Sequence, residues 1–220
     1  MNLKKRFTDS DLQRIKTAVK EAEQKISGEI VPVIVEKSGY YSSGNYKGSL
    51  IGASLAFIIM IFLDRYSMHD SNVTLYYDPI FMLMAVILGG VIGAAIPQFF
   101  PAVLRALINQ KHLNHSTRRK AESAFLEEEV FNTRHRTGIM IFISFFEREV
   151  IVMADRGISK VVDQKLWDGI VAELVNQIRL GKIVDGLEGA IKRCGELLLE
   201  KGFVITQDDV NELKDDLRIE

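Results

Sequence analysis

Cysteine is nearly absent from this sequence, which has a single one, Cys194, among 220 residues. One cysteine excludes an intramolecular disulfide and any cysteine-rich metal site. An excess of basic residues is also missing, because 28 Lys and Arg stand against 29 Asp and Glu. Proteins that hold nucleic acid by its phosphates rely on such an excess, so nucleic acid is not an expected partner.

Familiar catalytic motifs are missing as well. The sequence contains no P-loop, no GxSxG elbow, no HExxH zinc motif and no dinucleotide-binding fingerprint. The residues before position 48 also lack the apolar run of a signal peptide. We therefore expect that the N-terminal segment is not exported.

Charge is absent from two long stretches, which are the most informative part of the chain. Gly48 to Leu63 and Pro79 to Leu104 contain no Asp, Glu, Lys or Arg. As a helix the first would span about 24 Å at ~1.5 Å per residue, near the ~30 Å of a hydrocarbon core. The second can cross with tilt, or cross to Ile96 and continue along the interface after Pro97 and Pro101. We predict a transmembrane hairpin of two helices; the alternative is a buried core hairpin of a soluble protein.

The basic residues near the two spans predict an orientation. In the loop between the spans, Asp64 to Asp78, Arg65 is the only Lys or Arg, whereas the flanking segments are richer in these residues. These flanking residues are Lys37, Lys47, Arg105, Lys111, Arg118, Arg119 and Lys120. The positive-inside rule then predicts a multi-pass protein of the cell inner membrane with both termini in the cytoplasm.

Small residues recur at helical spacing in both spans. Gly48 and Gly52 lie four positions apart in the first span, as do Gly89 and Gly93 in the second. Such spacing lets helix backbones approach closely. The pattern predicts either packing of the two spans against each other or homo-oligomerisation, and the sequence leaves both open.

Outside the hairpin, helical and strand patterns alternate. Strands are predicted at Glu29–Glu36, where Pro32 favours an edge position or a bulge, and at Gly138–Phe145 and Glu149–Ala154, which are spaced as a β-hairpin. Helices are predicted at residues 8–26, 116–132, 163–180 and 185–201, and a last short one from Thr206 through Leu213.

This order describes one α/β domain interrupted by a membrane insertion. Residues 1–47 form its first part, 48–108 the transmembrane hairpin, 109–205 its second part and 206–220 a C-terminal helical tail. The water-soluble remainder is of the size of one ordinary domain.

Three stretches carry a resemblance to a known family. They are KISGEIVPVIVE, RTGIMIFISFFEREVIVMADRGISKVVD and WDGIVAELVNQIRLGKIVDGLEGAIKRCGELL. Together they resemble the TPM domain family, which includes thylakoid-lumen proteins and bacterial membrane proteins, some with reported phosphatase activity. The resemblance covers Phe7 to Val35 and Ser116 to Phe203. It implies a TPM-like mixed sheet flanked by helices, here interrupted by the two-helix hairpin.

Two acidic residues are candidates for a metal site. Asp155 follows a predicted strand and Asp163 begins a predicted helix, so both can lie at the end of the sheet where open α/β folds bind ligands. Two carboxylates there would suit Ca²⁺ or Mg²⁺, which prefer oxygen ligands. The alternative is structural: Asp163 is a natural N-cap, and Asp155 forms a turn with Arg156.

Arginines near the same strands are candidates for an anion site. Arg134 and Arg136 precede the strand that begins at Gly138, and Arg156 follows Asp155. Clustered arginines can hold a phosphate or carboxylate by paired hydrogen bonds. The alternative is that they form internal ion pairs with Glu147 or Asp155.

Two functions follow from these features. The preferred one is a TPM-like domain that faces the cytoplasm, is anchored in the lipid bilayer and acts as a binding or assembly module without a cofactor. Its partner would be another membrane protein. The alternative is a metal-assisted phosphatase, in which Asp155 and Asp163 hold Ca²⁺ or Mg²⁺ and Arg156 holds the phosphate.

Overall fold

The computed structural model describes residues 3–67, 78–205 and 211–220, and these divide into two compact units. One unit is formed by Met1–Ser38 together with Asn114–Glu220, and the other by Gly39–Leu113. The first unit is therefore built from segments on both sides of the second. The predicted hairpin at 48–108 lies within the second unit.

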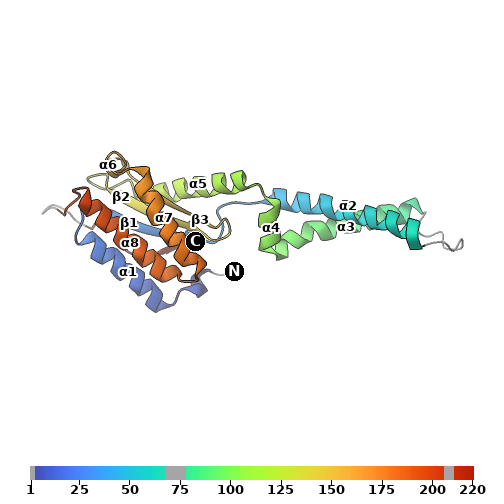
Figure 1. The fold of residues 1–220 in the computed structure, drawn as a ribbon, viewed down its shortest axis with the longest axis horizontal. Coiled ribbons are helices and arrows are strands. Elements are labelled where there is room, and N and C mark those ends of the chain that lie inside the picture. The colour runs from blue at the N-terminus through green and yellow to red at the C-terminus, as the bar shows by residue number, and fades with distance from the viewer. Residues whose placement is uncertain (1–2, 68–77, 206–210) are drawn as a thin grey trace. The chain divides into compact units, whose positions relative to one another are not determined.

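The first unit is built on a mixed sheet of four strands in the order β3-β2-β1-β4 (Figure 1). Strand β1 runs parallel to β2 and β4, while β2 and β3 pair antiparallel as the predicted hairpin. The strands are β1 (Glu29–Val35), β2 (Gly138–Ser144), β3 (Glu149–Ala154) and β4 (Arg218–Ile219). The mixed α/β class predicted from the sequence is confirmed.

Pro32 has no N–H to donate, and its position in β1 suits this lack of a donor. Among the described residues, β4 pairs only with Val33 and Ile34 of β1, so Pro32 has β2 on one side and no described strand on the other. A proline removes one ladder hydrogen bond, which costs least where one side of the strand is unpaired. The predicted edge position is wrong for β1 as a strand, because β1 lies between β2 and β4, but Pro32 lies outside the two residues that pair with β4.

Helices cover both faces of the sheet (Figure 1). One face packs against α1 (Asp9–Glu23), α7 (Gln164–Arg179) and α8 (Ile183–Glu200), and the other against α5 (Gln110–Glu127). All side chains of β1 and β2 are buried, as expected for strands covered on both faces. Two short helical turns, η1 (Leu3–Arg6) and α6 (Arg156–Ser159), complete this unit.

Local signals in the sequence explain where α1 and α7 begin. The Thr8 hydroxyl accepts the Asp11 N–H, and the Asp11 carboxylate accepts the Thr8 N–H, which makes a capping box. Asp163 caps α7 by accepting the Lys165 N–H. Each such cap stabilises a helix by about 1 kcal/mol.

The C-terminal helical tail predicted for residues 206–220 is wrong over 211–220, which contain β4 and no helix. The proposed cap Thr206 lies outside the described residues. The backbone here is engaged by distant side chains: both carboxylate oxygens of Glu29 accept N–H groups, from Glu212 and Leu213. Arg218 in turn donates to backbone carbonyls two and four residues earlier. The contacts of Glu29 with this segment are tertiary, and they override the local helical pattern.

The described part of the second unit contains α2 (Ser42–Ser67), α3 (Pro79–Phe99), α4 (Pro101–Leu107) and the start of α5. Pro97 does not end α3, contrary to the break considered from the sequence; the helix continues to Phe99. The chain turns at Phe100, which has φ −120° and ψ 93° and precedes Pro101. A residue before proline is disfavoured in helical conformation, which explains the turn at this position.

Candidate functional site

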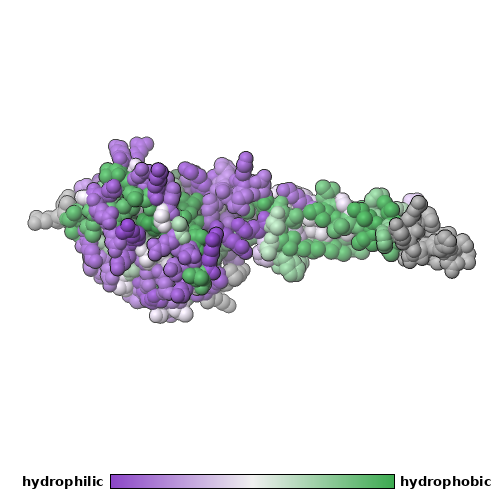
Figure 2. All heavy atoms as spheres, in the orientation of Figure 1, coloured by the Kyte–Doolittle hydropathy of each residue, from purple (hydrophilic) through white to green (hydrophobic). Residues whose placement is uncertain are grey.

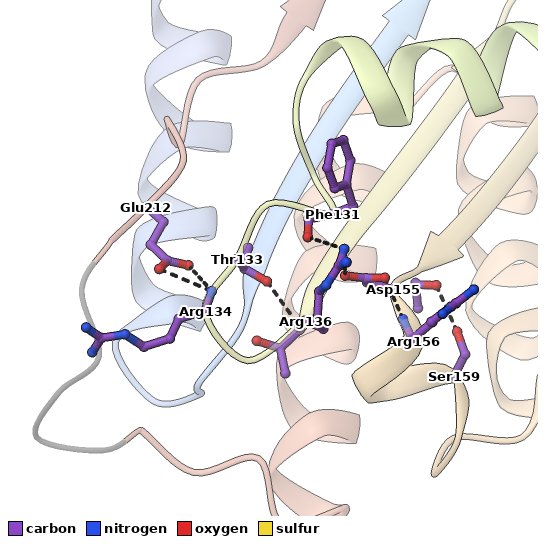
Figure 3. A network of polar contacts seen from close by, with 10 residues as sticks. Phe131, Thr133, Arg134, Arg136, Asp155, Arg156, Ser159 and Glu212 are labelled. Atoms are coloured by element: carbon purple, nitrogen blue, oxygen red, sulfur yellow. Dashed lines mark hydrogen bonds and ion pairs between the residues drawn. The ribbon is translucent and has the colours of Figure 1, made fainter.

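Four of the predicted site residues, Arg134, Arg136, Asp155 and Arg156, are found at the end of the sheet where β2 begins and β3 ends (Figure 3). The Asp155 N–H donates to the Gly138 carbonyl at 2.9 Å, so Asp155 directly follows the last paired residues of β3. Gly157 packs on the preceding loop: a Cβ at Gly157 would lie 2.5 Å from the Arg136 carbonyl oxygen. The backbone at Arg136 and the backbone just after Asp155 are therefore in contact.

Arg136 and Asp155 form an ion pair at this end of the sheet. The Arg136 Nη1 atom lies 3.6 Å from Asp155 Oδ2 and donates to the Phe131 carbonyl at 2.8 Å. Asp155 is 7% exposed, and its Oδ1 accepts the Arg156 N–H at 2.7 Å as the N-cap of α6. Its Oδ2 makes no hydrogen bond in the described part of the chain. The predicted ion pair of an arginine with Asp155 is present.

The three predicted anion-binding arginines do not converge. Figure 3 shows the guanidinium groups of Arg134 and Arg156 directed away from Arg136, on opposite sides. Their backbone N–H groups contribute instead: that of Arg134 donates to the Glu212 carboxylate, and that of Arg156 to Asp155. A clamp on one phosphate by all three side chains is not formed in this arrangement.

The second predicted acid, Asp163, is exposed and caps α7, as the structural alternative proposed. Asp155 is buried and paired with Arg136. The described residues contain no group of three or more His, Cys, Asp or Glu side chains placed to hold one metal ion. A metal at Asp155 would need further oxygen ligands from elsewhere.

Glu147, the other predicted ion-pair partner, lies at the opposite end of β2. It is fully buried, accepts the Ser38 N–H at 2.9 Å and accepts the Ser144 hydroxyl. The Ser38 and Ser144 hydroxyls are also 2.8 Å apart. This cluster joins the segment after β1 to the turn between β2 and β3.

Sequence reasoning missed a pair of glutamates beside the site. Burial raises the pKa of Glu23 to about 8, and burial also raises the pKa of Glu29. The Glu23 Oε1 atom accepts the Ile30 N–H at 2.8 Å, while Oε2 has no hydrogen-bond partner within residues 3–67, 78–205 and 211–220. Both glutamates line a small pocket of about 200 Å³ that Asn211 also lines. The one sequence signal was an acid, Glu29, opening an otherwise apolar strand.

A larger groove of about 1000 Å³ runs between α1 and α8. Its lining includes small residues such as Ala18 and Gly195 and charged side chains of both signs. Arg14 of α1 forms ion pairs with Asp185 and Glu188 of α8 at 2.8 and 2.7 Å. These exposed ion pairs join the two helices but identify no ligand.

In the second unit, the predicted glycines lie between α2 and α3, which run antiparallel. A Cβ at Gly48 would lie 2.3 Å from the Gly93 carbonyl oxygen, and one at Gly52 would lie 2.2 Å from that of Gly89. Pro97 has no N–H to donate to the Gly93 carbonyl one turn earlier, and Gly48 approaches that oxygen. Of the two alternatives, packing of the two helices on each other is observed. Homo-oligomerisation through the same glycines would require the helices to separate.

The outer faces of α2 and α3 are apolar and exposed (Figure 2). Both helices are long and apolar enough to cross a membrane, over Ser42–Leu63 and Pro79–Phe99. The large exposed side chains include Leu55 at 53%, Ile58 at 59%, Met84 at 61% and Leu88 at 60%. Only 11% of each of these apolar windows is buried by the described residues of this chain.

Comparison with known proteins supports the fold. No protein-family model matches the chain, and no curated protein matches it. A similar solved structure is the NMR structure of BA42 protein from the psychrophilic bacterium Bizionia argentinensis. Its TM-score is 0.59 with 17% sequence identity, covering 97% of this chain and 95% of that one. At this identity the likeness concerns the fold alone.

Proposed function

We propose that this chain is a membrane-anchored binding or assembly module whose α/β unit faces the cytoplasm at the bacterial inner membrane. The observation that carries the proposal is the pairing of α2 with α3. Their glycine faces are in contact, and their large apolar side chains point outward.

The outward faces favour lipid over water as their environment. Burying one Leu- or Ile-sized side chain away from water contributes about 1.5–3 kcal/mol, and the hairpin leaves many such side chains exposed. Soluble monomers rarely expose contiguous apolar patches larger than a few hundred Å². A bilayer would cover the whole patch, whereas a protein partner would have to surround both helices.

We also propose that the α/β unit is TPM-like. The three resembling stretches contain β1, then β2, β3 and α6, then α7 and α8. They thus form three strands of the mixed sheet and two of the helices that cover it. This agreement between the quoted stretches and one continuous part of the fold supports the proposal.

The module function is supported by the chemistry of the sheet end. Asp155 is neutralised by Arg136, Asp163 caps a helix, and the guanidinium groups of Arg134 and Arg156 point apart. These side chains hold the loops of the domain to one another. Such an end can present a rigid surface to another membrane protein.

One observation favours the metal-assisted phosphatase as a second candidate: the buried Oδ2 of Asp155 has no hydrogen-bond partner among the residues that the structure describes. Calorimetric titration with Ca²⁺ and Mg²⁺, together with a phosphatase assay, tests it. The module proposal expects no micromolar metal affinity, because Arg136 already compensates the Asp155 charge and a second cation would be repelled. Micromolar affinity with turnover abolished by Asp155→Asn would make the enzyme the leading function.

Reporter fusions test the membrane proposal. A reporter active only in the cytoplasm, fused after Glu220, should be active, and the same reporter inserted between Ser67 and Asn72 should be silent. A reporter active only outside the cytoplasm should give the reverse pattern. Cytoplasmic activity from both positions would contradict the anchor and the orientation together.

A further inference from the structure

The short helix α4 presents an apolar outer face. Pro101, Ala102, Val103 and Ala106 are exposed on this helix, while Leu104 is buried. These exposed residues carry no charge, and the charged residue of α4, Arg105, is half-buried. A short surface helix in water would ordinarily place polar side chains on its exposed face.

Contacts within the second unit fix which face of α4 is exposed. The Leu104 side chain packs on Gly44 of α2, where an added Cβ would lie 2.4 Å from Leu104 Cδ1. At the end of α4, the Lys47 ammonium group donates to the Leu107 carbonyl at 2.8 Å. Because α2 holds the helix on this side, Val103 and Ala106 remain on the outer face.

Exposed aromatic side chains lie at the end of the hairpin where α4 begins. Phe99 is 76% exposed and Phe100 58%, where α3 ends and the chain turns, and Tyr46 near the start of α2 is 74% exposed. Tyr and Trp side chains of membrane proteins concentrate where the headgroups meet the acyl chains, which is the depth expected for Tyr46. In the described residues these aromatics lie at the charged end of the hairpin, where Lys47 precedes the first uncharged run.

We propose that α4 lies in the interface plane of a phospholipid bilayer, with its outer face in the boundary between headgroups and acyl chains. The inference rests on the membrane anchor proposed above and specifies how deep α4 lies in the bilayer. At ~1.5 Å per residue, α4 is about 10 Å long and cannot span. Its apolar face continues the exposed apolar surface of α3, and an interfacial helix buries such a face by roughly 5–10 Å.

The test uses variants of the full chain that each carry one added cysteine, in phosphatidylcholine–phosphatidylglycerol vesicles and labelled with an environment-sensitive fluorophore. Val103→Cys probes α4, Leu88→Cys the middle of α3 and Lys192→Cys the exposed surface of α8. The native Cys194 is buried and burial raises its pKa to about 12, so it stays unlabelled in folded protein. Quenching is measured with aqueous iodide and with lipids carrying a nitroxide near the headgroup or deep in the acyl chain.

The Val103 probe should be protected from iodide and quenched more by the shallow nitroxide than by the deep one. The Leu88 probe should be quenched more by the deep nitroxide, and the Lys192 probe by iodide. Iodide quenching of Val103 equal to that of Lys192, with Leu88 still in the acyl region, would overturn the placement of α4 alone. Deep quenching of Val103 would also overturn it, by making α4 part of the span. Iodide quenching of Leu88 would overturn the anchor itself.

Discussion

Arg136 is the residue on which the end of the sheet depends most directly. It adopts φ 57°, a left-handed conformation uncommon for a side chain of this size, and its guanidinium joins Asp155 to the Phe131 carbonyl. The local sequence indicated an arginine cluster but not which arginine points inward. That choice depends on the backbone turn, which no pattern of residue types specifies.

Replacing Arg136 should destabilise the α/β unit. Arg136→Gln removes the cation beside the buried carboxylate of Asp155, and we expect a loss of about 1–3 kcal/mol in the free energy of unfolding. The matched control is Arg156→Gln, which keeps the backbone N–H that donates to Asp155. Urea unfolding of both variants in detergent measures the difference. Equal stability of the two variants would contradict the role assigned to the ion pair.

Glu23 should make stability depend on pH. Its pKa is raised from 4.5 to about 8 by burial, so between these values the folded state binds a proton that the unfolded state releases. The free energy of unfolding should therefore fall as the pH rises from 4.5 to 8. Glu23→Gln should flatten this dependence and add a few kcal/mol at pH 8, at about 1.4 kcal/mol per pKa unit.

The control for this prediction is Glu21→Gln, which removes an exposed carboxylate from the same helix. Chemical unfolding at pH 5 and pH 8 compares the two variants with the parent protein, with both pH values spanning the expected change. Glu29, whose pKa burial also raises, should leave a smaller dependence in Glu23→Gln. A fall in stability between pH 5 and pH 8 as large in Glu23→Gln as in the parent protein would show that other groups cause it.

At the scale of elements, local signals identified most helices and strands. The capping residues Thr8 and Asp163 and the spacing of β2 and β3 were sufficient, because each depends on neighbouring residues. The C-terminal tail failed because its backbone is held by Glu29, far away in the sequence. The Glu23–Glu29 pocket was missed for the same reason: burial of a carboxylate depends on tertiary packing.

The glycine contacts between α2 and α3 predict a sharp difference between two substitutions. Gly52→Ala places a methyl group 2.2 Å from the Gly89 carbonyl oxygen, so the helices must move apart. Gly90→Ala meets its nearest atom at 3.3 Å, the hydroxyl of Ser49, which can rotate. We expect Gly52→Ala to cost about 1–3 kcal/mol and Gly90→Ala to be nearly neutral.

Thermal unfolding in detergent and the protease resistance of the hairpin measure the stability of the Gly52→Ala and Gly90→Ala variants. The two variants add the same methyl group and the same helix propensity, so their difference isolates the contact. Similar stability of both variants would mean that α2 and α3 do not pack at Gly52.

At the scale of the molecule, the hairpin is an insertion in the α/β unit. Strand β1 precedes it and β2 follows it, yet the two strands pair along their full lengths. Ser38 after β1 is also tied to Glu147 after β2. The sheet is thus closed by contacts that do not involve the hairpin.

Deleting the hairpin should leave a domain that folds by itself. We expect a protein in which residue Ser38 is joined to Ser116 by a short flexible linker to be soluble and to unfold cooperatively. Circular dichroism during urea unfolding and analytical ultracentrifugation measure this outcome. A deletion product that is unfolded in water would mean that α2 and α3 are part of the core of the domain.

The pairing of β1 with β2 also sets an order of events during synthesis. Glu29 and its partner Gly138 are 109 positions apart, and the hairpin is translated between them. At ~5–20 residues per second, β1 waits on the order of ten seconds before the ribosome delivers its partner. The α/β unit is therefore completed only after the two apolar helices have left the ribosome. If those helices fail to insert into the membrane, β1 stays without its partner strand, and chaperones and proteases can recognise the unpaired strand.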